Sequence, residues 1–100
     1  MPLSLQSRRV GDITVVTCSG RIVEGDESAT LQKHFDDLLP DDPYILLDLG
    51  GVQFIDSSGL GLLVRFLART RTANGGLKLC AVPDTIAEVL RVTKLATIFE

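Results

Sequence analysis

Residues 56–61 read DSSGLG and place two hydroxyl groups and a carboxylate between two apolar segments. Asp56 or Ser57 can cap the free backbone N–H groups of a helix that starts here, because aspartate and serine are among the best capping residues. The partial positive charge of a helix N-terminus also favours an anion, phosphate included. Gly59 and Gly61 would let another molecule approach the first turn without meeting a side chain. The segment fits either an ordinary helix cap, which is the simpler interpretation, or a site that tolerates a bound or attached anion.

The helix that follows carries a second candidate feature on its predicted outer side. Five residues form one apolar arc at helical spacing: Leu60, Leu63, Val64, Leu67 and Ala68. The opposite strip contains Gly61, Arg65 and Arg69, with Leu62 at its edge. Together with the two hydroxyl groups, this strip has the composition of a docking surface for another protein. The alternative for the two arginines is a solvated helix face.

Recognisable catalytic groups are missing. The chain has no G-x-S-x-G nucleophile elbow, no complete dinucleotide fingerprint and no Walker lysine. His34 is the only histidine, and its position beside Leu31 and Leu38 predicts a partly buried structural side chain rather than a general base. No set of residues resembles zinc ligands. We therefore expect a protein that is not an enzyme, with no cofactor and no metal site.

Composition narrows the class of protein further. The 100 residues are 45% hydrophobic and carry a formal net charge of -3, which suits one domain over residues 1–100 and argues against nucleic-acid binding. No apolar run approaches the roughly 18 residues that a membrane span needs, and no signal peptide is recognisable. Cys18 and Cys80 match no metal or redox spacing, so we interpret them as reduced core residues. These observations predict a cytoplasmic protein without membrane insertion.

The hydrophobic pattern predicts the elements that position DSSGLG. Strands are expected at 3–8, 13–19, 44–49 and 77–82, with a short fifth strand at 97–99; helices are expected from 24–28 to Pro40, from 57 to about 71, and from Pro83 onward. The run 44–49 is almost continuously apolar, which is typical of a strand buried on both faces. The order predicts an α/β fold: a mixed, mostly parallel sheet of four to five strands, with an antiparallel hairpin first and helices packed on it.

In this context the DSSGLG segment resembles the anti-sigma factor antagonists of the STAS domain family. The resemblance covers almost the whole chain. It rests mainly on DSSGLG after the strand ILLDLGGVQFI, and also on Gly20 closing the second strand, Gly75-Gly76 before LKLCAV, and the closing VLRVTKLATIF. The resemblance implies a single-domain STAS-like fold and a regulatory binding function.

The resemblance also implies roles for individual residues. Ser57 would be the phosphoacceptor of a partner anti-sigma factor that is also a serine kinase. Unphosphorylated protein would sequester that partner and release a sigma factor for transcription; phosphorylated protein would let go, and a separate serine phosphatase would reset it. The partner-binding residues would be Glu24, Asp56, Ser58, Gly59, Leu60, Gly61, Leu62, Arg65 and Arg69.

One departure from the family pattern motivates a second interpretation. The family often has aspartate three residues after the glycine that ends the second strand, whereas Val23 stands there in this chain, with Glu24 and Asp26 nearby. The alternative function is a STAS adaptor that is not phosphorylated and serves as a subunit of a transport or signalling complex. Neither interpretation predicts an oligomeric state.

Overall fold

The computed structural model describes residues 3–99 and divides them into strands, helices and a final 3-10 turn. The strands are β1 (Ser4–Val10), β2 (Ile13–Ile22), β3 (Tyr44–Ile55) and β4 (Gly76–Cys80); the helices are α1 (Asp26–Leu38), α2 (Ser57–Thr72) and α3 (Asp84–Val92), and the 3-10 turn η1 spans Ala96–Phe99. No helix within the described residues is long and apolar enough to cross a bilayer.

The four strands lie in chain order, β1-β2-β3-β4. β1 and β2 form an antiparallel hairpin, and the two remaining pairs are parallel. Gly11 has a φ of 63°, which the tight turn between Val10 and Ile13 requires and which glycine adopts without strain. The structure confirms the predicted mixed, mostly parallel α/β fold.

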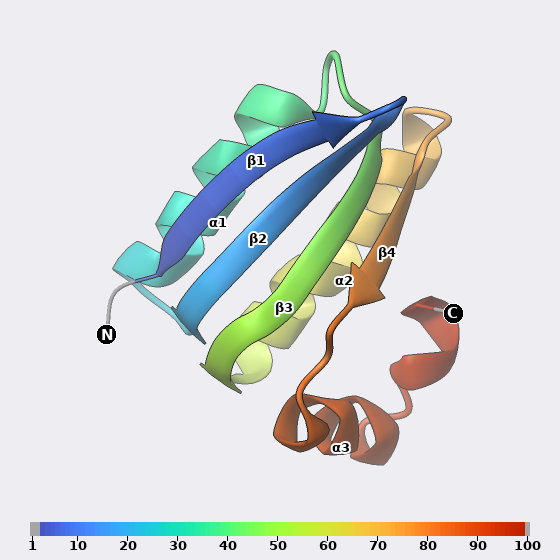
Figure 1. Ribbon diagram of the computed structural model, residues 1–100. Helices are drawn as coiled ribbons and strands as arrows, with labels where there is room; N and C mark the ends of the chain where they lie inside the picture. Colours follow the sequence, from blue (N-terminus) through green and yellow to red (C-terminus); the bar gives the residue numbers. More distant parts are fainter. Residues whose placement is uncertain (1–2, 100) are drawn as a thin grey trace.

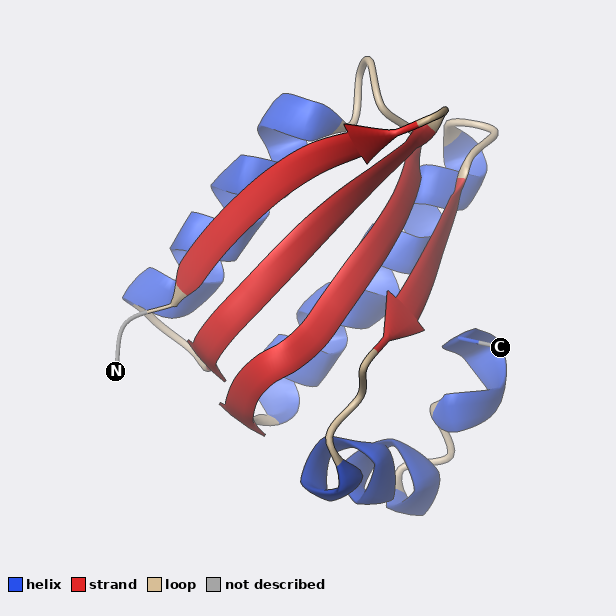
Figure 2. Cartoon of the chain, viewed as in Figure 1, coloured by secondary structure: helices blue, strands red, loops and turns tan. Residues whose placement is uncertain are grey.

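Helices α1 and α2 cover one face of the sheet, and none of the helices within residues 3–99 lies over the other face (Figures 1 and 2). Along β3, Ile45, Leu47 and Leu49 are buried beneath the helices. The alternate residues are not: Tyr44 is exposed and Leu46 is half-buried. The prediction that this strand is buried on both faces is therefore wrong, because only one layer of helices is present to cover it.

The core lies between the sheet and the two long helices. Phe35 of α1 and Phe66 of α2 stack with ring centroids 3.9 Å apart and planes 6° apart. Leu47 and Leu49 of β3 are fully buried in the same core, beside Cys18 of β2. Burial raises the pKa of the Cys18 thiol to about 12, so this group is held as the neutral thiol, as a core residue requires.

The structure extends two of the predicted strands. β3 does not stop at 49 but continues through Gly50 and Gly51 to Ile55, and β2 continues through Gly20 to Ile22. A Cβ on Gly51 would lie 2.4 Å from the Ser19 Oγ, beside a register shift in the β2–β3 pairing. Glycine is needed here for a close approach of two strands rather than for a turn.

The end of the chain also differs from expectation. Segment 97–99 forms the 3-10 turn η1 rather than a fifth strand, and its Phe99 is buried against the core. β4 ends at Cys80, short of the predicted Val82, because Ala81 adopts a φ of 52° that interrupts an extended strand. In the described part of the chain the sheet therefore has four strands.

Candidate functional site

Asp56 joins two parts of the molecule at the carboxyl end of the sheet. It is the N-cap of α2, and its Oδ1 accepts a hydrogen bond of 2.8 Å from the Gly59 N–H. Its Oδ2 accepts a second bond of 3.0 Å from the Glu24 N–H, in the loop between β2 and α1. One carboxylate thus caps the helix and fastens the neighbouring loop to it; we call this pair of bonds the Asp56 latch.

The two hydrogen bonds of the latch change the pKa of Asp56. The hydrogen bond from the Glu24 backbone, followed by the one from Gly59, lowers the pKa of the Asp56 carboxyl below its ordinary value of 3.8. Both donors stabilise the charged form, so the carboxylate is ionised at neutral pH. The loop on the far side of the latch is also tied to the start of α1, since the Ser28 Oγ donates a bond of 2.5 Å to the Val23 carbonyl.

The two hydroxyl groups beside Asp56 differ in accessibility. Ser57 is the first residue of α2 and is exposed, whereas Ser58 is half-buried. The Ser57 hydroxyl therefore lies at the positive end of a 16-residue helix, in reach of another molecule. Of the two, Ser57 is the better placed to receive or contact an anion.

The two glycines of the segment serve different purposes. A Cβ on Gly59 would lie 2.3 Å from the Ile22 carbonyl oxygen and 2.7 Å from a side-chain carbon of Ile55. Gly59 is buried and lets α2 start directly against β2, so the expectation that it admits an approaching molecule is wrong. Gly61 fits that expectation, because the only neighbour of an added Cβ would be the Arg65 Nη1 at 3.7 Å.

The remaining residues predicted to contact a partner also divide into buried and exposed ones. Leu60 and Leu62 are 8% and 2% exposed, so Leu62 belongs to the core and the prediction that it edges the outer strip is wrong. Helix α2 contacts β3, β4 and α1 together, and therefore buries a wider arc than one packed on a single surface. Glu24 and Arg65 are exposed. Ser57, Gly61 and Arg65, spaced by four, lie along one side of the helix.

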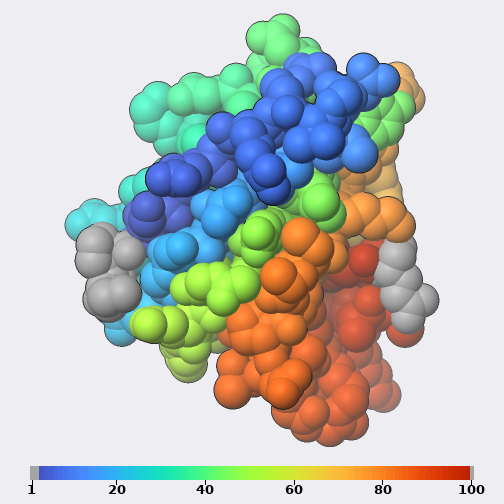
Figure 3. Space-filling view, viewed as in Figure 1, coloured from blue at the N-terminus to red at the C-terminus, as the bar shows by residue number. Residues whose placement is uncertain are grey.

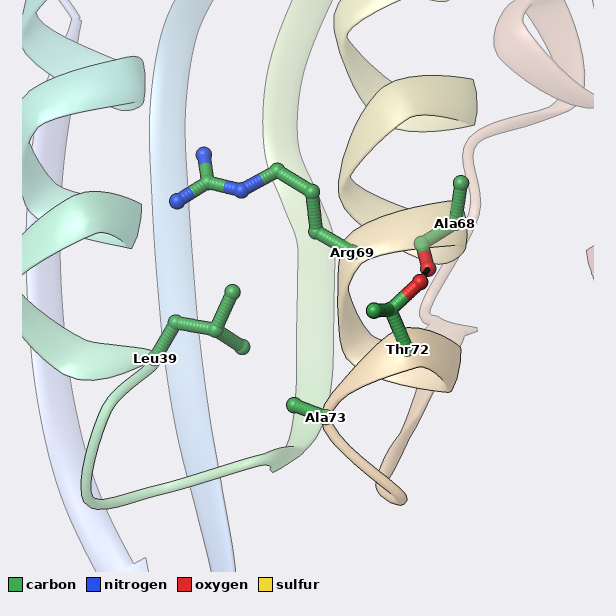
Figure 4. Close-up of a pocket in the computed structure, with 5 residues that line it drawn as sticks. All are labelled: Leu39, Ala68, Arg69, Thr72 and Ala73. Carbon is green, nitrogen blue, oxygen red and sulfur yellow. Dashed lines mark hydrogen bonds between the residues drawn. The ribbon is translucent and has the colours of Figure 1, made fainter.

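Arg69 lies apart from the start of α2. It is twelve residues from Ser57, which corresponds to about 18 Å along a helix axis. Its Nη1 lies 2.7 Å from the Asp36 Oδ1 of α1, and it lines a surface hollow with Leu39 and Thr72 (Figure 4). The structure thus uses Arg69 to tie two helices together and does not bring it to Ser57.

Two exposed residues near Ser57 were not singled out from the sequence. Phe54 and Arg21 are paired at the ends of β3 and β2, and both are exposed. Phe54 is 53% exposed, which is unusual for a large aromatic side chain two positions before the helix cap. Periodicity could not reveal it, because the register shift between Gly20 and Arg21 changes the strand pairing just before this point.

The described residues also bear on the expectation of no metal site and on that of a structural His34. Within residues 3–99, no group of three or more histidine, cysteine or acidic side chains could hold a metal ion. His34 is half-buried, and its Nε2 lies 2.5 Å from the Ser7 Oγ of β1. This contact joins α1 to the edge strand, and the half-buried position agrees with the prediction of a partly buried side chain.

Comparison with known proteins places the chain in a family. The STAS domain model matches residues 4–100, so the chain belongs to the STAS domain family. An anti-sigma factor antagonist domain protein from Planctomyces limnophilus is 27% identical, with a TM-score of 0.81, over 95% of this chain and 86% of that one. No curated protein matches the chain.

Two further solved structures share the fold at lower identity. The phosphorylated form of the Bacillus cell fate determinant SpoIIAA is 18% identical, with a TM-score of 0.74, over 94% of this chain and 86% of that one. A sulfate transporter family protein from Wolinella succinogenes is also 18% identical, with a TM-score of 0.78, over 91% of this chain and 74% of that one.

Proposed function

We propose that this chain is an anti-sigma factor antagonist that binds an anti-sigma factor when Ser57 is unmodified and releases it when Ser57 is phosphorylated. The observation that carries the proposal is the exposed Ser57 hydroxyl at the start of α2, beside the latched loop that presents Glu24. The 27% identical Planctomyces limnophilus protein, named as an antagonist of this kind, supports the same class of function.

The physical chemistry of the site supports a switch at the interface rather than in the fold. A phosphate adds about -1.5 to -2 of charge, which changes the net charge from -3 to about -4.5 to -5. The N-terminus of α2 stabilises that charge, so the domain stays folded. A closely fitting partner would have to desolvate the phosphate, at a cost of several kcal/mol, against a total binding free energy of about 8 kcal/mol for a micromolar complex.

The exposed residues around Ser57 define the docking surface in this proposal. Gly61 leaves room for close contact, Arg65 supplies a positive charge, and Phe54 supplies an aromatic anchor of the kind that carries binding energy in interfaces. The Asp56 latch keeps Glu24 beside this surface. The partner is an anti-sigma factor with serine kinase activity, and a serine phosphatase reverses the modification; the chain itself binds and does not catalyse.

Phosphate transfer tests the assignment of Ser57. The protein, Ser57→Ala and the matched control Ser58→Ala are incubated with ATP and an anti-sigma kinase encoded beside the gene, and phosphate is mapped by mass spectrometry. We expect the wild type and Ser58→Ala to carry phosphate on residue 57 and Ser57→Ala to carry none. Equal incorporation into Ser57→Ala, or no incorporation into the wild type, contradicts the proposal.

A second function, a STAS adaptor that is not phosphorylated, is favoured by two observations. Val23 occupies the position where the first function leads us to expect a carboxylate, and a sulfate transporter family protein shares the fold. Co-purification with Ser57→Asp as bait separates the two functions. Recovery of membrane transporter subunits by both the wild type and Ser57→Asp supports the adaptor; loss of the captured protein with Ser57→Asp supports the switch.

A further inference from the structure

Three large apolar side chains lie exposed and side by side on the open face of the sheet. Their exposed fractions are 55% for Val10, 44% for Ile13 and 49% for Tyr44. Val10 pairs with Ile13 across the hairpin, and the Thr14–Ile45 pairing makes Ile13 and Tyr44 neighbours as well. A single exposed apolar residue is ordinary, whereas a contiguous group indicates a binding surface.

The apolar surface continues inward and is hollowed. In the next row Val15, which is 6% exposed, pairs with the half-buried Leu46, and both lie outside the core cluster beneath the helices. Beside Tyr44 a hollow of about 290 Å³ opens; it is lined by Ile13, Tyr44, Ile45, Leu46, Gly76 and Lys78. A Cβ on Gly76 would meet no atom within 4 Å, so this position stays open. The half-exposed Tyr44 side chain thus lines one side of a hollow on this face.

Ile13 and Tyr44 lie in one row across the strands of the sheet. The charged residues nearest to this row are acidic toward the hairpin turn and basic toward the middle of the sheet. Asp12 lies beyond the row, in the hairpin turn, and is exposed. Arg8 and Lys78 lie one row inward, level with Val15 and Leu46 in the register. A two-fold axis through the Ile13–Tyr44 row, perpendicular to the strands, would place Asp12 of each copy over Arg8 of the other. The face is therefore complementary to itself in charge.

We propose that this face is the interface of a homodimer. In a two-fold interface each copy presents the same patch, so a residue and its contact partner occur twice. Tyr44 and the adjoining hollow supply that reciprocal fit, and the opposite charges fix the direction. An acidic peptide would complement Arg8 but would meet repulsion from Asp12, which favours a second copy of this chain over such a partner.

The dimer leaves the proposed Ser57 surface free. Tyr44 is the first residue of β3 and Ile55 is the last, so the two surfaces lie at opposite ends of that strand (Figures 1 and 3). Self-association is therefore independent of the state of Ser57. Two docking surfaces in one particle would also raise the avidity for a partner that is itself dimeric.

Sedimentation equilibrium over a range of protein concentrations tests the interface. We expect the mass to rise from 10.8 kDa toward twice that value, and Tyr44→Lys to raise the dissociation constant by about tenfold or more. Val92→Lys is the matched control, since Val92 is 64% exposed on α3 and should leave the dimer unchanged. Circular dichroism verifies that each variant is folded.

A charge reversal tests the proposed orientation. Asp12→Arg should weaken the dimer, and adding Arg8→Asp to it should restore association. A wild type that stays monomeric at every concentration overturns the proposal, as does a dimer that Val92→Lys disrupts and Tyr44→Lys does not. Ser57→Asp should dimerise like the wild type, so a failed phosphorylation experiment and a failed dimer remain distinguishable.

Discussion

The outer and inner sides of the first turns of α2 differ in their exposure to solvent, although their residues are interleaved in the sequence. On the outer side Ser57 and Arg65 are exposed, and the half-buried Gly61 leaves open space beside the helix. The inner side, Gly59 and Leu62, is buried against β2 and the core. Substitutions on the inner side should therefore change stability, and those on the outer side should change recognition of a partner.

Leu62→Ala should give the largest loss of stability. Leu62 is 2% exposed in the core, and removing a buried leucine side chain costs roughly 2–5 kcal/mol through lost burial and the cavity that remains. Urea denaturation of the wild type and the variant measures the difference in free energy of unfolding. A loss below about 0.5 kcal/mol, the range of surface substitutions, would contradict the inner assignment.

Gly59→Ala should follow, with a loss of about 2–3 kcal/mol. Its Cβ would lie 2.3 Å from the Ile22 carbonyl oxygen at the end of β2. This backbone atom cannot move aside easily, because it accepts a hydrogen bond from the Asp56 N–H. Gly61→Ala is the matched control on the outer side. It should stabilise the helix by up to about 1 kcal/mol, because alanine is the better helix former and the space is open. Equal changes in the free energy of unfolding at the two glycines would contradict the assignment of Gly59 to the buried side of α2 and of Gly61 to the outer side.

Asp56→Ala should destabilise the domain by about 1–2 kcal/mol at pH 7, since it removes a helix cap and the bond to the Glu24 N–H. The folded-state pKa of Asp56 is lowered below 3.8, so its contribution is present above pH 3.8 and is lost as the pH falls through the folded-state value. The gap between wild type and variant in thermal unfolding should therefore narrow below pH 4. A gap that does not change with pH would contradict a role for the carboxylate charge, and Asp56→Asn separates that charge from the shape of the side chain.

Arg65→Ala should have the smallest effect on stability, within about 0.5 kcal/mol, because the side chain is exposed. Its effect should appear in the affinity for the anti-sigma factor, measured by calorimetry. Arg69→Ala is the contrasting variant: it removes the Asp36 ion pair far from Ser57 and should leave the affinity unchanged. If Arg69→Ala lowered the affinity and Arg65→Ala did not, the docking surface would lie nearer the C-terminal end of α2.

The sequence predicted most of the fold and the helix cap at the candidate site, and the failures share a physical cause. Strand and helix order follow from local periodicity, and the cap at Asp56 follows from local backbone chemistry. The burial of Leu62 does not, because it depends on α1 and the sheet enclosing α2 from several sides. The Asp56 latch joins residues 32 positions apart, and no local pattern encodes such a bond.

The open sheet face illustrates the same cause. The run 44–49 is apolar enough for a strand covered on both sides, yet the two long helices, α1 and α2, lie on the same side of the sheet (Figure 2). Leu46 is half-buried beside its sheet neighbour Val15 rather than under a helix. An apolar strand pattern predicts that both faces of the strand are buried. It does not show whether a helix of the same chain or another molecule buries them.

Calorimetric titration of the anti-sigma factor with wild type and Ser57→Asp, alongside urea denaturation of both, tests the central claim most directly. The account predicts a loss of affinity of about a hundredfold or more, equivalent to roughly 2.7 kcal/mol, with a free energy of unfolding that stays within about 0.5 kcal/mol. Unchanged affinity would contradict the account. So would a loss of affinity matched by a loss of stability, because the new charge would then act by unfolding the domain rather than at the docking surface.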